Sequence, residues 1–91
     1  MSVLLLRFAK SFAVGRLSAV VFSEAYIELW KIARDKGLLF ADAPVLSECL
    51  SSIFCAADMY CGDDELREEY EFNDEQLRSE VFRVLQVVES N

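Results

Sequence analysis

Histidine is absent from this 91-residue sequence, and its absence excludes several classes of active site. Without histidine there can be no Ser-His-Asp triad, no Cys-His pair and no histidine ligand for zinc. Proline occurs once and glycine three times, whereas 54% of the residues are hydrophobic. Such a composition excludes a disordered chain and a collagen-like polymer. We therefore expect a single globular domain over residues 1–91.

Basic residues are also scarce, with nine Lys and Arg against sixteen Asp and Glu and a formal net charge of −7. Direct binding to nucleic acid or to an anionic membrane requires a basic face. We expect neither kind of binding.

The sequence contains only three cysteines, Cys49, Cys55 and Cys61, and no C-x-x-C motif. Steps of six residues would spread them around a helix instead of bringing them together on a metal. We interpret them as small hydrophobic residues kept reduced in the cytoplasm, with no metal or cofactor bound. The apolar start of the chain is only four residues long, from Val3 to Leu6, and no uncharged run reaches the roughly 18 residues that span a bilayer. The expected location is therefore cytoplasmic.

Apolar residues recur at steps of three and four along the chain, which is the spacing of amphipathic helices. A first helix is predicted from about residue 2 to residue 14, because Gly15 supplies a conformation that ends many helices. A second helix begins after Ser18, whose side chain is suited to cap it, and ends at Gly37. The apolar stripes of these two helices are Leu5, Phe8 and Phe12, then Ala19, Phe22, Tyr26, Leu29 and Ala33.

A third helix is predicted to start at Pro44, since proline is well suited to the first helical position. Asp42 or Ala43 would cap it, after a connector over residues 38–43, and Gly62 would end it. Its apolar stripe is Leu46, Leu50, Ile53, Ala57 and Tyr60.

A charged loop over residues 63–72 leads to the fourth predicted helix, which begins at Asn73. Gln76 lies three residues further on, the spacing of a capping box. The apolar stripe of this helix is Leu77, Val81, Val84 and Val88. Four amphipathic helices without a convincing strand predict an all-α protein, an antiparallel four-helix bundle.

Charge is distributed very unevenly along the chain. Residues 1–57 hold five acids and six bases, whereas residues 58–91 hold eleven acids and three arginines. Ten of the acids occur between residues 58 and 80: Asp58, Asp63, Asp64, Glu65, Glu68, Glu69, Glu71, Asp74, Glu75 and Glu80. The third helix leads into the loop and the fourth leaves it, so we expect all ten at one end and flank of the bundle. Like charges gathered in this way repel one another, and stability alone does not require them.

Several interpretations of this acidic segment can be compared. It could be a solvated loop that keeps the protein soluble, or a surface complementary to a basic partner. A calcium-binding EF-hand that started at Asp63 would place Arg67 at a ligand position and Glu68 where the turn requires glycine, so that loop fails. Nothing distinguishes one pair of carboxylates for hydrolysis, and we therefore expect no enzyme.

The aromatic residues are expected mainly in the core. Most of them fall on or beside the apolar stripes: Phe8, Phe12, Phe22, Tyr26, Phe54 and Phe82. Trp30 is next to a stripe and is interpreted as part of the core rim. Tyr60 and Tyr70 bracket the acidic loop, where each could pack its ring on the bundle and offer its hydroxyl to a partner.

Five segments of the chain resemble the colicin D immunity protein family. They are residues 8–12 (FAKSF), 17–24 (LSAVVFSE), 54–58 (FCAAD), 70–74 (YEFND) and 77–81 (LRSEV). Each motif is short, but they follow one another in the same order and with similar spacing, so the resemblance extends over nearly the whole chain.

The resemblance implies a small acidic four-helix bundle that binds the nuclease domain of a bacterial toxin. Toxins of this kind cut tRNA in its anticodon loop, and their immunity proteins fill the basic active-site groove with carboxylates that stand in for phosphates. Relatives protect against bacteriocins or against toxins of contact-dependent growth inhibition systems. By position, the inhibitory acids of the family match Asp58 and Asp63, and Glu80 matches an acid of the fourth helix.

The sequence differs from the colicin D member in ways that leave the identity of its toxin open. Its loop is about one residue longer and more acidic, Cys61 replaces an acid near the start of the loop, and the second helix is less basic and includes Trp30.

The resulting prediction is an immunity protein, a monomer in a 1:1 complex with its cognate toxin nuclease domain. The residues predicted to bind this partner are Asp58, Tyr60, Asp63, Asp64, Glu65, Glu68, Glu69, Tyr70, Glu71 and Glu80. Two other classes remain open. One is an acidic nucleic-acid mimic that inhibits a host DNA-binding or restriction protein, and the other is an enzyme or metal-binding regulator.

Overall fold

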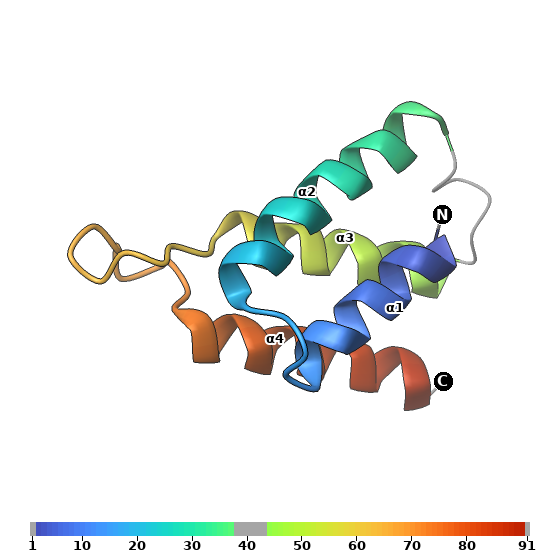
Figure 1. Cartoon of the computed structure of the whole chain (residues 1–91). Coiled ribbons are helices and arrows are strands. Elements are labelled where there is room, and N and C mark those ends of the chain that lie inside the picture. The colour runs from blue at the N-terminus through green and yellow to red at the C-terminus, as the bar shows by residue number, and fades with distance from the viewer. Residues whose placement is uncertain (1, 38–43, 91) are drawn as a thin grey trace.

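The computed structural model describes residues 2–37 and 44–90, which form four helices around a shared core (Figure 1). The helices are α1 (Ser2–Ala13), α2 (Ala19–Asp35), α3 (Pro44–Asp58) and α4 (Asp74–Ser90). The predicted all-α four-helix bundle is confirmed. Figure 1 shows α3 running toward a long loop and α4 running away from it, while the antiparallel order of all four helices stays a prediction.

The ends of the helices follow local signals in the sequence. The Ser18 side chain accepts a hydrogen bond of 3.2 Å from the Val21 amide at the start of α2, as predicted. Before α4, the Asn73 amide donates to Gln76 Oε1 at 2.9 Å and the Gln76 amide donates to Asn73 Oδ1 at 2.8 Å. This reciprocal pair is the predicted capping box. Gly15 has a φ of +89°, which lets the chain turn away after α1.

The third helix begins at Pro44, as predicted, but it ends earlier than the sequence indicated. Its last residue is Asp58, not Gly62, so Tyr60 lies outside the helical stripe assigned to it. The cause is a non-local contact, because Tyr60 pairs with Phe72 through an isolated bridge closed by backbone hydrogen bonds of 2.9 and 3.0 Å. The predicted caps Asp42 and Ala43, with the connector over 38–43, lie outside the described residues.

The core draws on all four helices. Its largest fully buried side chains are Leu5, Phe12, Phe22, Tyr26, Leu50, Ile53, Leu77 and Val81, all of them on predicted stripes. The Phe12 and Phe22 rings stack with centroids 4.2 Å apart. The Tyr26 hydroxyl donates to the Leu50 carbonyl at 2.7 Å, which joins α2 to α3 with a buried polar contact.

Two aromatic residues, Phe82 and Trp30, can be compared with their predicted positions in or beside the core. Phe82 is half exposed on α4, so its assignment to the core was wrong. It lies at the edge of the inner face of α4, where it lines a shallow hollow with Lys10 and Ala13 of α1 and stays open to solvent. Trp30 is half-buried against the core and stacks on Phe54 with centroids 4.2 Å apart, consistent with the predicted core rim.

An arginine that the sequence analysis did not single out ties α4 to the turn between α1 and α2. Arg78 donates from Nε to the Phe12 carbonyl at 3.0 Å and from Nη2 to the Leu17 carbonyl at 2.9 Å. Its guanidinium also lies 4.6 Å from the centroid of the Phe12 ring. These contacts fix the first turns of α4, and therefore the end of the long loop, against the rest of the bundle.

The cysteines do not all lie on one helix, because Cys61 follows the end of α3. Cys49 is buried, Cys55 is exposed and Cys61 is half-buried, and all three are free thiols. Burial raises the pKa of the Cys49 thiol, which keeps it protonated and unreactive. Within residues 2–37 and 44–90, no helix combines the length and the apolar character needed to cross a membrane.

Candidate binding surface

The ten acids between residues 58 and 80, here called the acidic surface, are organised by one loop. Asp58 is the last residue of α3, Asp74 is the first residue of α4, and the loop between these helices protrudes beyond one end of the bundle (Figure 1). The bridge between Tyr60 and Phe72 holds the two ends of the loop together. The acids of the loop and of the adjoining helix ends therefore gather at one end of the molecule.

Most of the acidic surface is exposed and not neutralised. Eight of the ten side chains belong to exposed residues, and Glu71 and Glu80 are half-buried. Among the described residues, two of the ten form ion pairs: Asp64 with Arg67 at 2.8 Å, and Glu80 with Arg83. The remaining eight carboxylates produce a strong negative potential at this end of the protein.

Arg67 braces the loop from inside. Only 18% of its side chain is exposed, and its Nε donates to the Cys61 carbonyl at 2.9 Å. Its backbone amide donates to the Asp63 carbonyl at 3.0 Å. Through these bonds and its ion pair with Asp64, Arg67 ties three points of the loop together.

Two acids serve as acceptors for loop amides as well as carrying charge. Asp63 Oδ1 accepts a hydrogen bond of 2.9 Å from the Glu65 amide, and Glu71 Oε1 accepts one of 2.9 Å from the Glu68 amide. The Glu71 amide in turn donates to the Glu68 carbonyl at 3.1 Å. The loop is thus held in shape by hydrogen bonds, with little apolar burial of its own.

The two tyrosines that bracket the loop differ in their surroundings. The half-buried Tyr60 donates its hydroxyl to Asp74 Oδ1 at 2.6 Å, so the group that the sequence analysis offered to a partner is engaged within the chain. Burial, the hydrogen bond to Asp74 and the charge of that carboxylate raise the pKa of Tyr60 to about 12. Tyr70, in contrast, is 69% exposed.

Gly62 makes room for this arrangement. A Cβ atom at Gly62 would lie 2.7 Å from the Tyr60 hydroxyl oxygen. A side chain at position 62 would displace the Tyr60 hydroxyl, so glycine here serves the close approach of the Tyr60 ring and does not end a helix.

Glu80 lies further along α4 than the other acids. The Arg83 guanidinium bonds to it and holds the pKa of the Glu80 carboxyl below its usual value. Glu80 also lines a shallow hollow with Glu75 and with Phe72, the residue that closes the loop. Glu80 therefore lies on the same side of α4 as Phe72 at the base of the loop.

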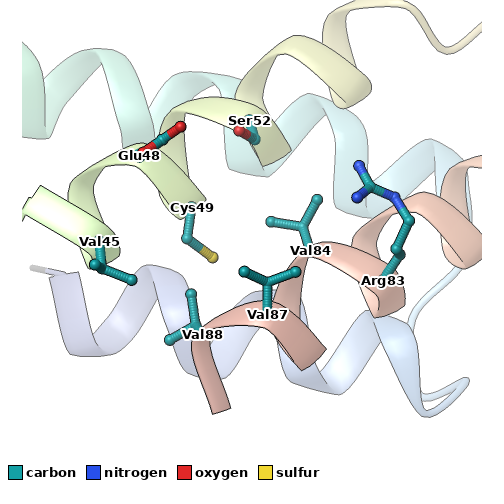
Figure 2. Close-up of a pocket in the computed structure, with 8 residues that line it drawn as sticks. All are labelled: Val45, Glu48, Cys49, Ser52, Arg83, Val84, Val87 and Val88. Carbon is teal, nitrogen blue, oxygen red and sulfur yellow. The ribbon is translucent and has the colours of Figure 1, made fainter. Parts of the chain in front are cut away.

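A second hollow, of about 380 Å³, lies between α3 and α4 (Figure 2). Valines from both helices line much of it, and the Cys49 thiol points toward the α4 valines in Figure 2. Its charged residues are Glu48 and Arg83, of which Arg83 is paired with Glu80. No set of His, Cys, Asp or Glu side chains able to hold a metal ion occurs within residues 2–37 and 44–90.

Sequence reasoning identified the acids but missed Leu66 and the role of Arg67. Leu66 is 70% exposed in the middle of the acidic loop. The signal available in the sequence was a lone aliphatic residue in a ten-residue segment, 63–72, that holds seven charged residues. A search for the apolar stripes of helices does not detect such a residue.

The described residues form an all-α bundle whose acidic surface is braced by Arg67. Comparison with models of protein families identifies the family of the chain. The family model for bacterial self-protective colicin-like immunity matches residues 1–88, and the chain belongs to this family. A search of curated proteins finds no match. Membership implies that the chain binds a cognate toxin protein.

Proposed function

We propose that this chain neutralises a tRNA-cutting bacterial toxin by covering its basic active-site groove with the acidic surface. The observation that carries the proposal is a set of eight carboxylates on and beside a loop braced by Arg67, none of which forms an ion pair with another residue in the ranges 2–37 and 44–90. Their mutual repulsion costs stability, and a basic partner would relieve it.

The chemistry of such a groove suits this surface. A nuclease must present cations to hold a polyanion, and a carboxylate can pair with lysine or with the two-pronged guanidinium of arginine much as a phosphate does. A loop already held in shape loses less conformational entropy on binding than a flexible acidic tail would. Charge complementarity also raises the rate of association.

In this proposal the chain acts by occupancy alone, as a monomer in a 1:1 complex and without catalysis. Because tRNA is cytoplasmic, the proposed site of action is the cytoplasm. The toxin would be delivered as a bacteriocin or by contact-dependent growth inhibition. We expect the gene immediately upstream to encode a large secreted protein that ends in a basic domain of about one hundred residues.

The test uses that basic domain, with tRNA cleavage and calorimetric binding as readouts. One equivalent of this chain should abolish cleavage. Asp58→Asn and Asp63→Asn should each weaken binding by at least about 2 kcal/mol, the scale of a desolvated charge pair. Asparagine at position 63 can still accept the hydrogen bond from the Glu65 amide, so this variant removes charge while keeping the turn.

Glu28→Gln is the matched control, because Glu28 is an exposed acid on α2 outside the acidic surface. Equal binding by all three variants would mean that the acidic surface is not the interface. If the chain instead inhibits a DNA-binding or restriction protein and leaves the neighbouring nuclease active, the nucleic-acid-mimic alternative holds. A calcium-dependent shift in thermal unfolding after EDTA treatment would favour a metal-binding regulator.

A further inference from the structure

The acidic loop exposes two large apolar side chains that the proposed charge mimicry does not use. Leu66 and Tyr70 are 70% and 69% exposed, the highest values in the loop among its large hydrophobic residues. Neither packs against the core cluster of the bundle. Their exposure is unfavourable in water and contributes nothing to folding.

Hydrogen bonds of the loop hold the backbone at or beside both residues. Leu66 lies midway between Tyr60 and Phe72, the residues that close the loop, and its amide donates to the Asp63 carbonyl at 3.2 Å. Its neighbour Arg67 is directed inward to the Cys61 carbonyl. Tyr70 lies inside the turn formed by the Glu68 and Glu71 backbone groups.

We propose that Leu66 and Tyr70 are apolar anchors that enter a nonpolar recess within the basic surface of the toxin. This inference rests on the proposed function and adds a second component to it. In protein interfaces a few residues near the centre carry most of the binding energy, and tyrosine is among the commonest of them. The buried centre of an interface is more apolar than its rim, and lysine and the acidic residues are depleted there. The acids that flank Leu66 and Tyr70 along the loop would form such a rim, and their charge favours a partner rich in lysine and arginine.

The two components predict different kinetics. Exposed charges act at long range and are screened by salt, so they set the association rate. The contact of an uncharged leucine with an apolar recess is not screened by salt. Such short-range contacts form after the encounter, so we expect them to act mainly on the dissociation rate. The anchors therefore explain how a complex steered by charge can persist at physiological ionic strength.

The experiment measures association and dissociation rates by surface plasmon resonance at several salt concentrations, with the basic domain encoded by the neighbouring gene as the probe. Leu66→Ser should raise the dissociation rate about tenfold or more, as expected for loss of one buried leucine, with the association rate unchanged. The slope of log Kd against log salt concentration should also stay unchanged. Glu69→Gln should instead lower the association rate and reduce that slope.

Conservative variants separate the anchors from nonspecific effects. Leu66→Met should bind like the unmodified chain, and Tyr70→Phe should bind far better than Tyr70→Ser because the ring is what enters the recess. Val3→Ser is the matched control, since Val3 is 60% exposed in the first turn of α1, which starts at the far end of the molecule from the loop (Figure 1). The thermal midpoint of Leu66→Ser should be unchanged, because the side chain is exposed.

If Leu66→Ser and Tyr70→Ser dissociate at the rate of the unmodified chain while Glu69→Gln binds more weakly, Leu66 and Tyr70 are not anchors. The acidic surface would then still be the interface. If Glu69→Gln and Asp58→Asn also bind normally, the proposed function itself fails.

Discussion

Tyr60 connects the bundle to the acidic loop through a single side chain. Its hydroxyl donates to Asp74 at the start of α4, and its ring fills the space left by Gly62. The spacing of apolar residues placed Tyr60 on a helical stripe, and the structure places it in a bridge with Phe72. A residue that looks like core in the sequence therefore orders the base of the loop.

Replacing Asp74 with asparagine should lower the pKa of Tyr60 from about 12 toward the ordinary tyrosine value of about 10. The variant removes the charge of the carboxylate and weakens the hydrogen bond, whereas burial, the largest cause of the shift, still raises the pKa of Tyr60. Ultraviolet absorbance of the phenolate follows the titration, and Tyr60→Phe identifies the step that belongs to this residue. An unchanged titration in the Asp74→Asn variant would show that Asp74 does not control Tyr60.

The same shift has a consequence for stability in alkali. Because folding raises the pKa of Tyr60, the unfolded chain loses this proton first as the pH rises. The stabilisation is complete below about pH 10 and is lost as the pH rises from about 10 to about 12. The Asp74→Asn variant should lose less stability across this range.

The loop between α3 and α4 is an ordered element without a hydrophobic core. Polar contacts of Arg67 hold the loop in place of apolar packing, because its side chain bonds to the Cys61 carbonyl and to Asp64. A charged run in a sequence is ordinarily interpreted as a solvated loop, and nothing in the local pattern distinguishes an arginine directed inward from one that faces solvent.

Arg67→Gln should therefore loosen the loop and leave the helices folded. Amide hydrogen exchange at positions 66 and 67, whose backbone amides both donate to the Asp63 carbonyl, should become faster. The thermal midpoint should change little, because the main core is untouched. Arg83→Gln serves as the control, since Arg83 also pairs with an acid but lies on α4. Loop amides that exchange equally in Arg67→Gln and in the unmodified chain would contradict the bracing role.

Helix starts were predictable because their signals are local. Ser18, Asn73 with Gln76, and Pro44 each act within one turn of the helix that they begin. The end of α3 was not predictable, because it depends on pairing between Tyr60 and a residue beyond the loop. The contacts of Arg78 with α1 and with the turn after it are likewise set by tertiary packing.

At the scale of the whole molecule, charge is separated along the chain. Residues 1–57 are close to neutral, and most of the negative charge belongs to the acidic surface. This asymmetry could be predicted from the sequence, because α3 must end and α4 must begin beside the loop. The sequence could not predict which side chains of the loop are exposed, because the exposure of Leu66 and Tyr70 depends on how the loop folds.

Repulsion within the acidic surface should make the free protein more stable in salt. Raising the NaCl concentration from about 0.01 M to about 0.15 M shortens the screening length from about 30 Å to about 8 Å. The thermal midpoint should rise over this range, and the rise should be smaller when Glu65, Glu68 and Glu69 are all replaced by glutamine. A midpoint that falls with salt would mean that attraction, not repulsion, dominates the charges of this chain.

The central claim is that the acidic surface is where the toxin binds. Hydrogen exchange of the chain, measured by mass spectrometry alone and with one equivalent of the neighbouring basic domain, tests it most directly. We predict strong protection of residues 58–75 in the complex and unchanged exchange in α2. Protection confined to α1 and α2, with the loop exchanging as it does in the free chain, would contradict the account.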